Sequence, residues 1–193
     1  MNLDWRHPAW RFRRRILRAA VLGALPLVLG TGCLLTSGQV LISFPLADIS
    51  VPTVGAAIRR DIDLNSIADY QDHKDSLKDL VDLALLGQVH NTGGATSVEF
   101  WMTPGSTSIA TAAGVRSDPT AILVWGPFLL AAGAIQQIGW DASAGLFVGR
   151  QALLKEAKGD GVFTLYALAS SSATAAVFDV NNGVLVLVLD GGL

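Results

Sequence analysis

Residues 162–190 read VFTLYALASSSATAAVFDVNNGVLVLVLD, and this stretch decides the fold class. It contains three runs rich in β-branched and other apolar residues, at Val162–Ala169, Ala173–Val180 and Val184–Asp190. Short runs of this composition are typical of strands. Asn181-Asn182-Gly183 is a tight-turn signal, and it predicts that the last two strands form a hairpin.

The chain before residue 162 predicts further strands at Gln39–Phe44, Ala57–Leu64, Leu83–His90, Ser97–Met102, Ala121–Trp125 and Ala132–Ile138. The turn signal at residues 91–94 predicts a hairpin between the two strands that flank it. Residues 119–140 carry no charge, but Gly126-Pro127 and Gln136-Gln137 interrupt the apolar run. We therefore expect two buried strands there and not a membrane span.

Two helices are expected among these strands. The first runs from Ile67 to Leu80 after an N-cap at Asn65 or Ser66, with aspartates and lysines on its solvated side. The second has Asp141 as its N-cap and ends at Lys158. Short strands with two inserted helices predict a mainly β, β-sandwich-like domain, with an α+β arrangement as the alternative.

The N-terminal residues predict a targeting segment in front of one domain. Residues 1–18 are rich in arginine, residues 19–29 are apolar and uncharged, and small residues follow them. This order is typical of a secretory signal peptide. We therefore expect residues 1–32 to be a signal peptide, 33–38 a short membrane-proximal segment and 39–193 a single globular domain.

Leu29-Gly30-Thr31-Gly32-Cys33 resembles the lipobox of bacterial lipoproteins, whose cysteine is acylated and becomes the new N-terminus. The resemblance implies cleavage between Gly32 and Cys33, and a lipid anchor on Cys33. Leu34 in place of an aspartate implies sorting to the outer membrane of a Gram-negative-like cell, on its periplasmic or surface side. The alternatives are an ordinary signal peptidase cutting before Cys33, and an uncleaved apolar anchor over Ala19–Leu35.

The arginines also resemble a second export signal. Arg13-Arg14-Arg15-Ile16-Leu17-Arg18 is similar to the twin-arginine pattern, which implies folding before export. An ordinary secretory signal with additional arginines is the alternative, so both export routes stay open.

The charge of the exported part argues against nucleic acid as a partner. Residues 33–193 hold eight Lys or Arg and fifteen Asp or Glu, which gives a net charge of −7. Nucleic-acid-binding proteins need a basic surface to neutralise phosphates. The expected partners are the membrane, reached through the lipid anchor, and an envelope protein or a second copy of this chain.

Asp61-x-Asp63-x-Asn65, followed by Asp69 and Asp72, has the spacing of an EF-hand calcium loop. However, Ser66 stands where the sharp turn of that loop needs glycine, and Asp72 stands where a longer glutamate is usual. We read the aspartates as the acidic start of a helix, so we expect no metal and no cofactor.

The remaining polar residues do not form a catalytic motif. After the signal peptide the histidines are His73 and His90, and neither lies in a metal-binding frame. The sequence has no GxSxG elbow and no phosphate-binding loop. We therefore expect a non-catalytic domain with a structural or interaction role.

The aromatic side chains are expected in the core, namely Trp101, Trp125, Trp140, Phe100, Phe128 and Phe147. Two alternatives depend on their surroundings. A cavity lined by Trp101, Trp125 or Phe147 would favour an apolar-ligand carrier, and buried carboxylates beside His90 in a cleft would favour an enzyme of unrecognised type. A filled core with an exposed apolar patch would favour the interaction module.

Overall fold

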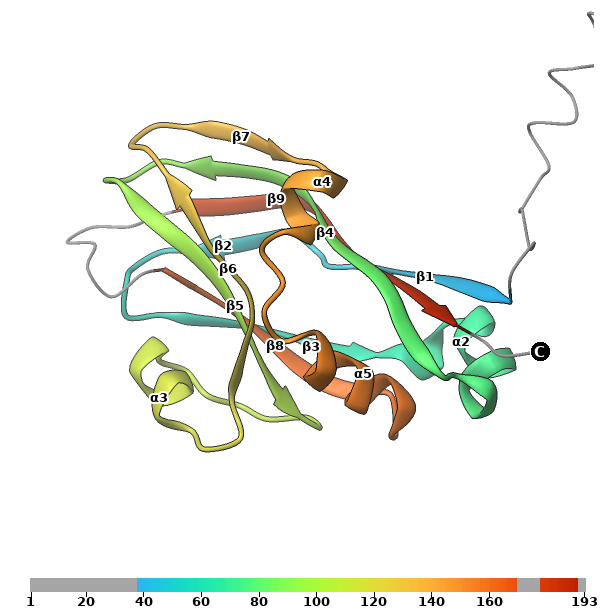
Figure 1. Cartoon of the computed structure of the whole chain (residues 1–193). Helices are drawn as coiled ribbons and strands as arrows, with labels where there is room; N and C mark the ends of the chain where they lie inside the picture. The colour runs from blue at the N-terminus through green and yellow to red at the C-terminus, as the bar shows by residue number, and fades with distance from the viewer. Residues whose placement is uncertain (1–37, 170–177, 191–193) are drawn as a thin grey trace, which may run out of the picture. The chain divides into compact units, whose positions relative to one another are not determined.

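A computed structural model describes residues 38–169 and 178–190, which belong to one compact unit, Ser37–Leu193. The strands form two antiparallel sheets that pack against each other through an apolar core (Figure 1). This confirms the predicted mainly β, sandwich-like fold.

The first sheet consists of β1 (Gln39–Pro45), β2 (Ile49–Val51), β4 (Asp79–Asn91), β7 (Ile135–Ile138) and β9 (Phe178–Asp190). Its strand order is β1-β9-β4-β7, and β2 pairs with β9 beyond the end of β1. The long strands β4 and β9 pair along most of their length, so they form the centre of this sheet.

The second sheet consists of β3 (Ala57–Asp63), β5 (Thr96–Pro104), β6 (Ile122–Leu130) and β8 (Val162–Ala169), in the order β3-β8-β5-β6. Gly126 in β6 has a φ of 100°, which favours glycine. A Cβ at this position would lie 2.6 Å from the carbonyl oxygen of Val98 in β5. A larger residue would therefore separate β6 from β5.

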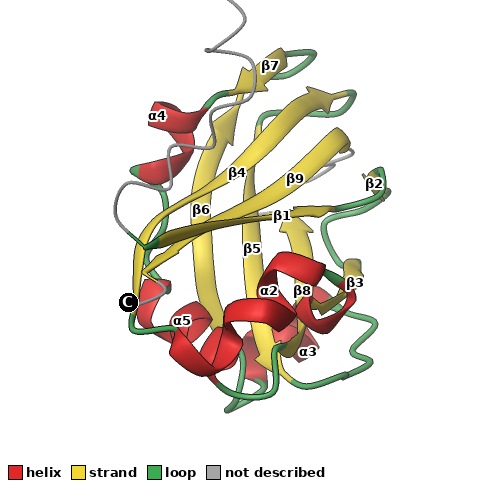
Figure 2. Cartoon of the chain, turned by 90° about the vertical axis from the view of Figure 1, so that its right-hand side faces the viewer, coloured by secondary structure: helices red, strands yellow, loops and turns green. Residues whose placement is uncertain are grey.

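Short helices cover the ends and one outer side of the sandwich. η1 (Leu64–Ser66), α2 (Ala68–His73) and η2 (Lys74–Ser76) connect β3 to β4. α3 (Ala112–Ser117) packs on β8, α4 (Trp140–Ala144) contacts β4, and α5 (Arg150–Lys158) contacts β4, β6 and β8. Figure 2 shows α2 and α5 at the same end of the sandwich.

The core lies between the two sheets and takes side chains from both. Ile42, Leu85 and Leu187 enter it from the first sheet, and Phe100 and Trp125 from the second. The rings of Phe100 and Trp125 meet edge-on, with centroids 5.6 Å apart and an interplanar angle of 74°. Burying one such side chain stabilises the fold by roughly 1.5–3 kcal/mol, so this core is the main source of stability.

The predicted hairpin across residues 91–94 is wrong. Both strands exist as β4 and β5, but β4 pairs with β7 and β9 whereas β5 pairs with β6 and β8. The turn carries the chain from one sheet to the other. Buried Asn91 holds this crossing, because its side-chain amide donates to the carbonyls of Gly94 at 2.9 Å and Ala131 at 2.8 Å.

The first predicted helix, Ile67 to Leu80, is wrong in its second half, because α2 ends at His73 and β4 begins at Asp79. Leu80 is buried, but it lies on a strand opposite Leu189 of β9. The predicted caps are also wrong. Asp63 accepts the N–H of Asn65 at the start of η1, and Ile67 precedes α2 without a side-chain cap.

The uncharged run 119–140 forms two strands, but burial was predicted wrongly for the second. β6 continues through the cis Gly126-Pro127 bond, and β7 exposes three of its four residues. β7 is exposed because it lies at the edge of the first sheet. Within the part of the chain that the structure describes, no helix is long and apolar enough to cross a membrane.

The second predicted helix is divided into α4 and α5. The N-cap of α4 is Gly139 and not Asp141, as predicted for the longer helix. Between the two helices, residues 145–149 run beside β6. The N–H groups of Val148 and Gly149 both donate to the carbonyl of Val124, at 3.0 and 3.2 Å. In a continuous helix these two N–H groups would donate to carbonyls of the helix itself. Here they donate to the open edge of β6.

The predicted C-terminal hairpin is also wrong, because β9 runs unbroken through Asn181-Asn182-Gly183. Residues 173–177 lie outside the described residues. Asn182 adopts a φ of 52°, and Gly87 in β4 adopts 152°. The pairing of β4 with β9 shifts at this point, so the turn-prone residues form a bulge and not a reversal.

Candidate functional site

Cys33 and Gly32 lie outside the described residues, so lipid attachment and cleavage at this position stay predictions. The first described strand, β1, begins at Gln39, six residues after Cys33. The described domain therefore starts close to the predicted anchor in the sequence.

The structure places the residues of the calcium-like spacing in separate local contacts. The carboxylate of Asp61 accepts from Arg59 at 2.6 Å and from Thr164 at 3.1 Å. Asp63 accepts from the backbone N–H and the side-chain amide of Asn65, at 3.0 and 2.9 Å. Among the described residues, no group of three His, Cys, Asp or Glu side chains could hold a metal ion.

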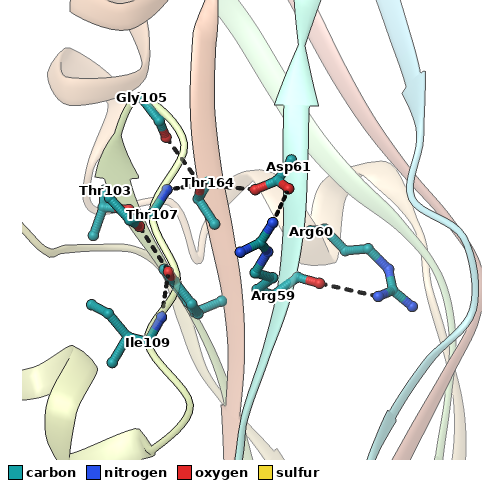
Figure 3. A network of polar contacts seen from close by, with 9 residues as sticks. Arg59, Arg60, Asp61, Thr103, Gly105, Thr107, Ile109 and Thr164 are labelled. Carbon is teal, nitrogen blue, oxygen red and sulfur yellow. Dashed lines mark hydrogen bonds and ion pairs between the residues drawn. The ribbon is translucent and has the colours of Figure 1, made fainter.

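Asp61 is the exposed end of a polar network on the outer side of the second sheet (Figure 3). The Thr164 hydroxyl lies 3.1 Å from Asp61 and 3.0 Å from the carbonyl oxygen of Gly105. It also accepts the backbone N–H of Thr107 at 3.0 Å. This side chain therefore connects β3 to the loop that follows β5.

The network continues through buried hydroxyl groups. The Thr107 hydroxyl lies 2.5 Å from that of Thr103 and 2.7 Å from that of Tyr166. The Tyr166 hydroxyl in turn accepts the N–H of Ile109 at 3.1 Å. Because each hydroxyl has a partner and Thr103, Thr164 and Tyr166 are buried, the network fixes the loop. Sequence reasoning missed it, because its members come from three distant segments.

A second polar contact, also missed, fixes α3 to the same side of the sheet. Arg116 forms an ion pair with Glu99 at 3.1 Å and donates to the carbonyl of Ala169 at 2.8 Å. The indole N–H of Trp101 donates to the same Glu99 oxygen atom at 2.9 Å. The carboxylate thus holds both a helix and an aromatic ring in place.

The histidines lie outside these contacts. His73 is exposed at the end of α2, and its Nδ1 lies 2.9 Å from the carbonyl oxygen of Asp69. His90 lies on β4 between Ile135 of β7 and Asp179 of β9. Neither histidine lines the two cavities described next.

Four of the aromatic residues pack in the core or against it. Trp125 and Phe100 are buried there as expected, and Phe147 and Phe128 pack against it. The cavity lined by Leu85, Phe100, Val124, Trp125, Phe147, Leu153, Leu165 and Leu185 has a volume of about 10 Å³. This volume is about that of one water probe, so this cavity cannot hold a larger ligand.

Two tryptophans lie outside this core. Trp101 packs with Tyr166 and Leu168 under α3, on the outer side of the second sheet. Trp140 is half-buried on α4, and its indole N–H donates to Asp82 at 2.9 Å. The expectation of a core position is therefore wrong for Trp140, whereas Trp101 packs against this second, smaller apolar cluster.

A larger cleft lies at the surface, between α5 and the beginning of β6. Its volume is about 500 Å³, and it is lined by Met102, Pro104, Pro119, Thr120, Ile122, Gln151, Ala152, Lys155 and Glu156. Hydrogen bonds from the Thr120 hydroxyl and N–H lower the pKa of the neighbouring Asp118 carboxyl. Most of the accessible lining is apolar, and Ile122 is 42% exposed.

A mostly apolar surface lies on the outer side of the first sheet, beside Asp82, and we call it the outer patch. It consists of Leu41, Ser43 and Pro45 on β1, Val184, Val186 and Val188 on β9, and Ala84 and Leu86 on β4. Leu41 is 57% exposed, Val184, Val188 and Leu86 are partly exposed, and Val186 and Ala84 are buried. The alternating residues Ile42, Leu187 and Leu85 point to the core.

No known protein family model matches the chain, and no curated protein matches it either.

Proposed function

We propose that the chain is exported and anchored at an envelope membrane by a lipid on Cys33, with a non-catalytic domain that has a structural or interaction role. The distribution of apolar side chains is the observation that carries the interaction role. The core cavity lined by Phe100 and Trp125 has a volume of only about 10 Å³, whereas the outer patch keeps apolar side chains at the surface. Apolar surface of this kind is typical of a binding face.

Metabolic labelling with radioactive palmitate tests the anchor. We expect incorporation into the wild type and into the control variant Thr36→Ser, but none into Cys33→Ser, which lacks the thiol that accepts the acyl group. Equal labelling of Cys33→Ser would contradict the proposal. So would an intact mass showing that residues 1–32 remain on the membrane-bound protein.

The position of Leu34 supports a place at the outer membrane. By resemblance to lipoprotein sorting, Leu34→Asp should move the protein to the inner membrane, as measured by density-gradient separation of the two membranes. Leu35→Asp is the matched control, because it adds the same charge one residue beyond the sorting position. An unchanged distribution of Leu34→Asp would exclude this sorting rule for the chain.

The surface cleft favours a second candidate function, that of an apolar-ligand carrier. Its volume of about 500 Å³ lies within the range of small-molecule sites. Titration with a fluorescent fatty acid tests this function. A carrier would show saturable binding that Ile122→Asp abolishes and Leu129→Asp, at an exposed position elsewhere on β6, preserves. Equal binding by both variants would exclude the cleft as the binding site of the fatty acid.

A further inference from the structure

We propose that the free edge of β7 pairs with the same edge of a second copy of this chain, so that the first sheets of the two copies join into one antiparallel sheet. This inference rests on the interaction role proposed above and adds a partner and a contact surface to it. Three observations carry it, namely the open backbone groups of β7, the absence of charge around them, and a register that gives each of them a partner.

The backbone of β7 is paired on one side only. β7 is the last strand of the first sheet, and Figure 1 shows it at the margin of that sheet, beside β4. The N–H of Asn91 donates to the carbonyl oxygen of Ala134 at 2.8 Å, in register with the ladder between β4 and β7. Backbone groups of successive residues point to opposite edges of a strand, so those of Gln136 face β4, whereas those of Ile135 and Gln137 face away from it. Within residues 38–169 and 178–190, no strand pairs with this second side of β7.

The edges of the second sheet are protected against such pairing, whereas the edge of β7 is not. Residues 145–149 donate to the edge of β6, and β3 carries four charged residues. β7 contains neither a charged residue nor a proline, and its first three residues are exposed. Covering segments, charged side chains and prolines are the means by which natural proteins prevent contact between sheet edges. The lack of these features in β7 is typical of an edge that accepts another strand.

The surroundings of β7 allow two copies of an acidic domain to approach each other. Residues 33–193 carry a net charge of −7, and this charge opposes contact between two copies at an acidic surface. Residues 119–140 contain no charged side chain, and this run includes β6, β7 and the turn between them. These two strands therefore bring no like charges together when the edges meet. Ile135 is 63% exposed, so pairing also removes apolar surface from water.

The register favours a second copy over an unrelated strand. A two-fold axis through Gln136, perpendicular to the sheet, places Ile135 opposite Gln137 of the second copy and Gln137 opposite Ile135 of the second copy. All of these residues direct their backbone groups to the free edge, so each pair exchanges both N–H···O bonds. The two Gln136 side chains lie opposite each other, and a primary amide both donates and accepts. Beyond the pairs, Gly133 lies beside Gly139 of the second copy, and a Cβ at either glycine would have nothing within 4 Å, which leaves room at both ends.

Disulfide trapping in the full chain tests the pairing. The strand is short, so the contact is smaller than the interface of a stable dimer, and a covalent trap detects it best. Membranes of cells that produce Gln136→Cys are oxidised and analysed by electrophoresis without reductant. We expect a covalent dimer, because residues opposite each other at this axis have Cα atoms about 4.5 Å apart, within the range of disulfides.

Two controls should remain monomeric. Leu41→Cys is the matched control, because Leu41 is 57% exposed on β1, at the opposite edge of the same sheet. The wild type contains Cys33 as its one cysteine, and acylation of this thiol prevents its oxidation.

A second pair of variants tests the backbone hydrogen bonds. In the Gln136→Cys chain, Gln137→Pro removes an N–H that faces the free edge and leaves the bonds between β7 and β4 in place. We expect this change to abolish the covalent dimer. Gln137→Ala keeps the N–H and should preserve the dimer. Thermal unfolding of both variants checks the fold, and the comparison of Gln136→Cys with Leu41→Cys decides the inference whatever the stability of the proline variant.

The contrary outcomes are distinct. No dimer of Gln136→Cys, or an equal amount of dimer from Leu41→Cys, overturns the pairing. A dimer that a folded Gln137→Pro chain retains overturns it too. Cross-linking of Gln136→Cys to a chain of another mass would identify a different protein at this edge and overturn the second copy as the partner.

The anchor is read separately in the same membranes by palmitate labelling. Absence of the label together with the Gln136→Cys dimer overturns the anchor and leaves the pairing intact, whereas label without the dimer does the reverse. A dimer of the wild type would show a free Cys33 thiol and contradict acylation, and Gln136→Cys combined with Cys33→Ser then decides the pairing.

Discussion

Tyr70 connects the α2 segment to α5. Its replacement by phenylalanine tests how much this contact stabilises the end of the domain where the two helices lie. Its ring is fully buried, and its hydroxyl donates to the carbonyl oxygen of Ala157 at 2.8 Å. Tyr70→Phe keeps the ring but leaves this buried carbonyl without its partner. We expect the free energy of unfolding to fall by about 1 to 3 kcal/mol, the cost of one unsatisfied buried group.

The same side chain predicts how stability depends on pH. Burial, followed by the negative charges of Asp160, Asp63 and Asp75, raises the pKa of Tyr70 above its ordinary value of 10.0. The folded state thus disfavours the phenolate, and the contribution is fully present below about pH 10. As the pH rises from there toward the folded pKa, the unfolded chain loses this proton first, so stability falls.

Urea unfolding followed by tryptophan fluorescence measures both effects. The loss of stability above pH 10 should be smaller in Tyr70→Phe than in the wild type. Ser76→Ala is the control, because it removes an exposed hydroxyl that bonds within the same segment. A change of less than about 0.5 kcal/mol in Tyr70→Phe would show that the bond to Ala157 does not hold α5 in place.

Three further outcomes are expected. Residues 38–193 alone should unfold in one cooperative thermal transition in aqueous buffer, and a need for detergent would show that the unit Ser37–Leu193 is not autonomous. Micromolar calcium should leave the melting temperature unchanged, and an increase abolished by Asp61→Ala would restore the calcium reading. Gly87→Ala should lower the free energy of unfolding by about 1–3 kcal/mol, because Gly87 has a φ of 152° and a Cβ would lie 3.2 Å from the Asn181 oxygen. Gly145→Ala, with helical backbone angles and open space around it, should change it little in the same urea titration.

Local sequence patterns predicted most of the strands but not their partners. Gln39–Phe44 and Val162–Ala169 agree with β1 and β8 to within one residue, because alternation and β-branched composition act within a single strand. Residues 91–94 identify a change of direction, yet the same residues suit a hairpin and a crossing between sheets. The partner of β4 is fixed by long-range pairing with β9, which no short window contains.

The errors in the helices have a related cause. Leu77 and Leu80 are spaced as on one face of a helix, but the spacing also permits an extended entry into β4, and the pairing of Leu80 with Leu189 decides the outcome. The predicted helix 141–158 is broken where residues 145–149 satisfy the edge of β6. In both regions tertiary hydrogen bonds outweigh a local preference worth only tenths of a kcal/mol per residue.

The outer patch is a surface that the sequence could have predicted in part. Val184–Asp190 is apolar at nearly every position, without the polar alternation of a strand that has one solvated face. Such a strand indicates apolar contact on both sides of its sheet. Leu185 and Leu187 meet the second sheet, whereas Val184 and Val188 remain partly exposed on the other side. The sequence alone therefore contained the signal for two apolar faces. The acidic side chains beside this surface became visible only with the register, which places Asp82 opposite Val188 and Asp79 opposite Asp190.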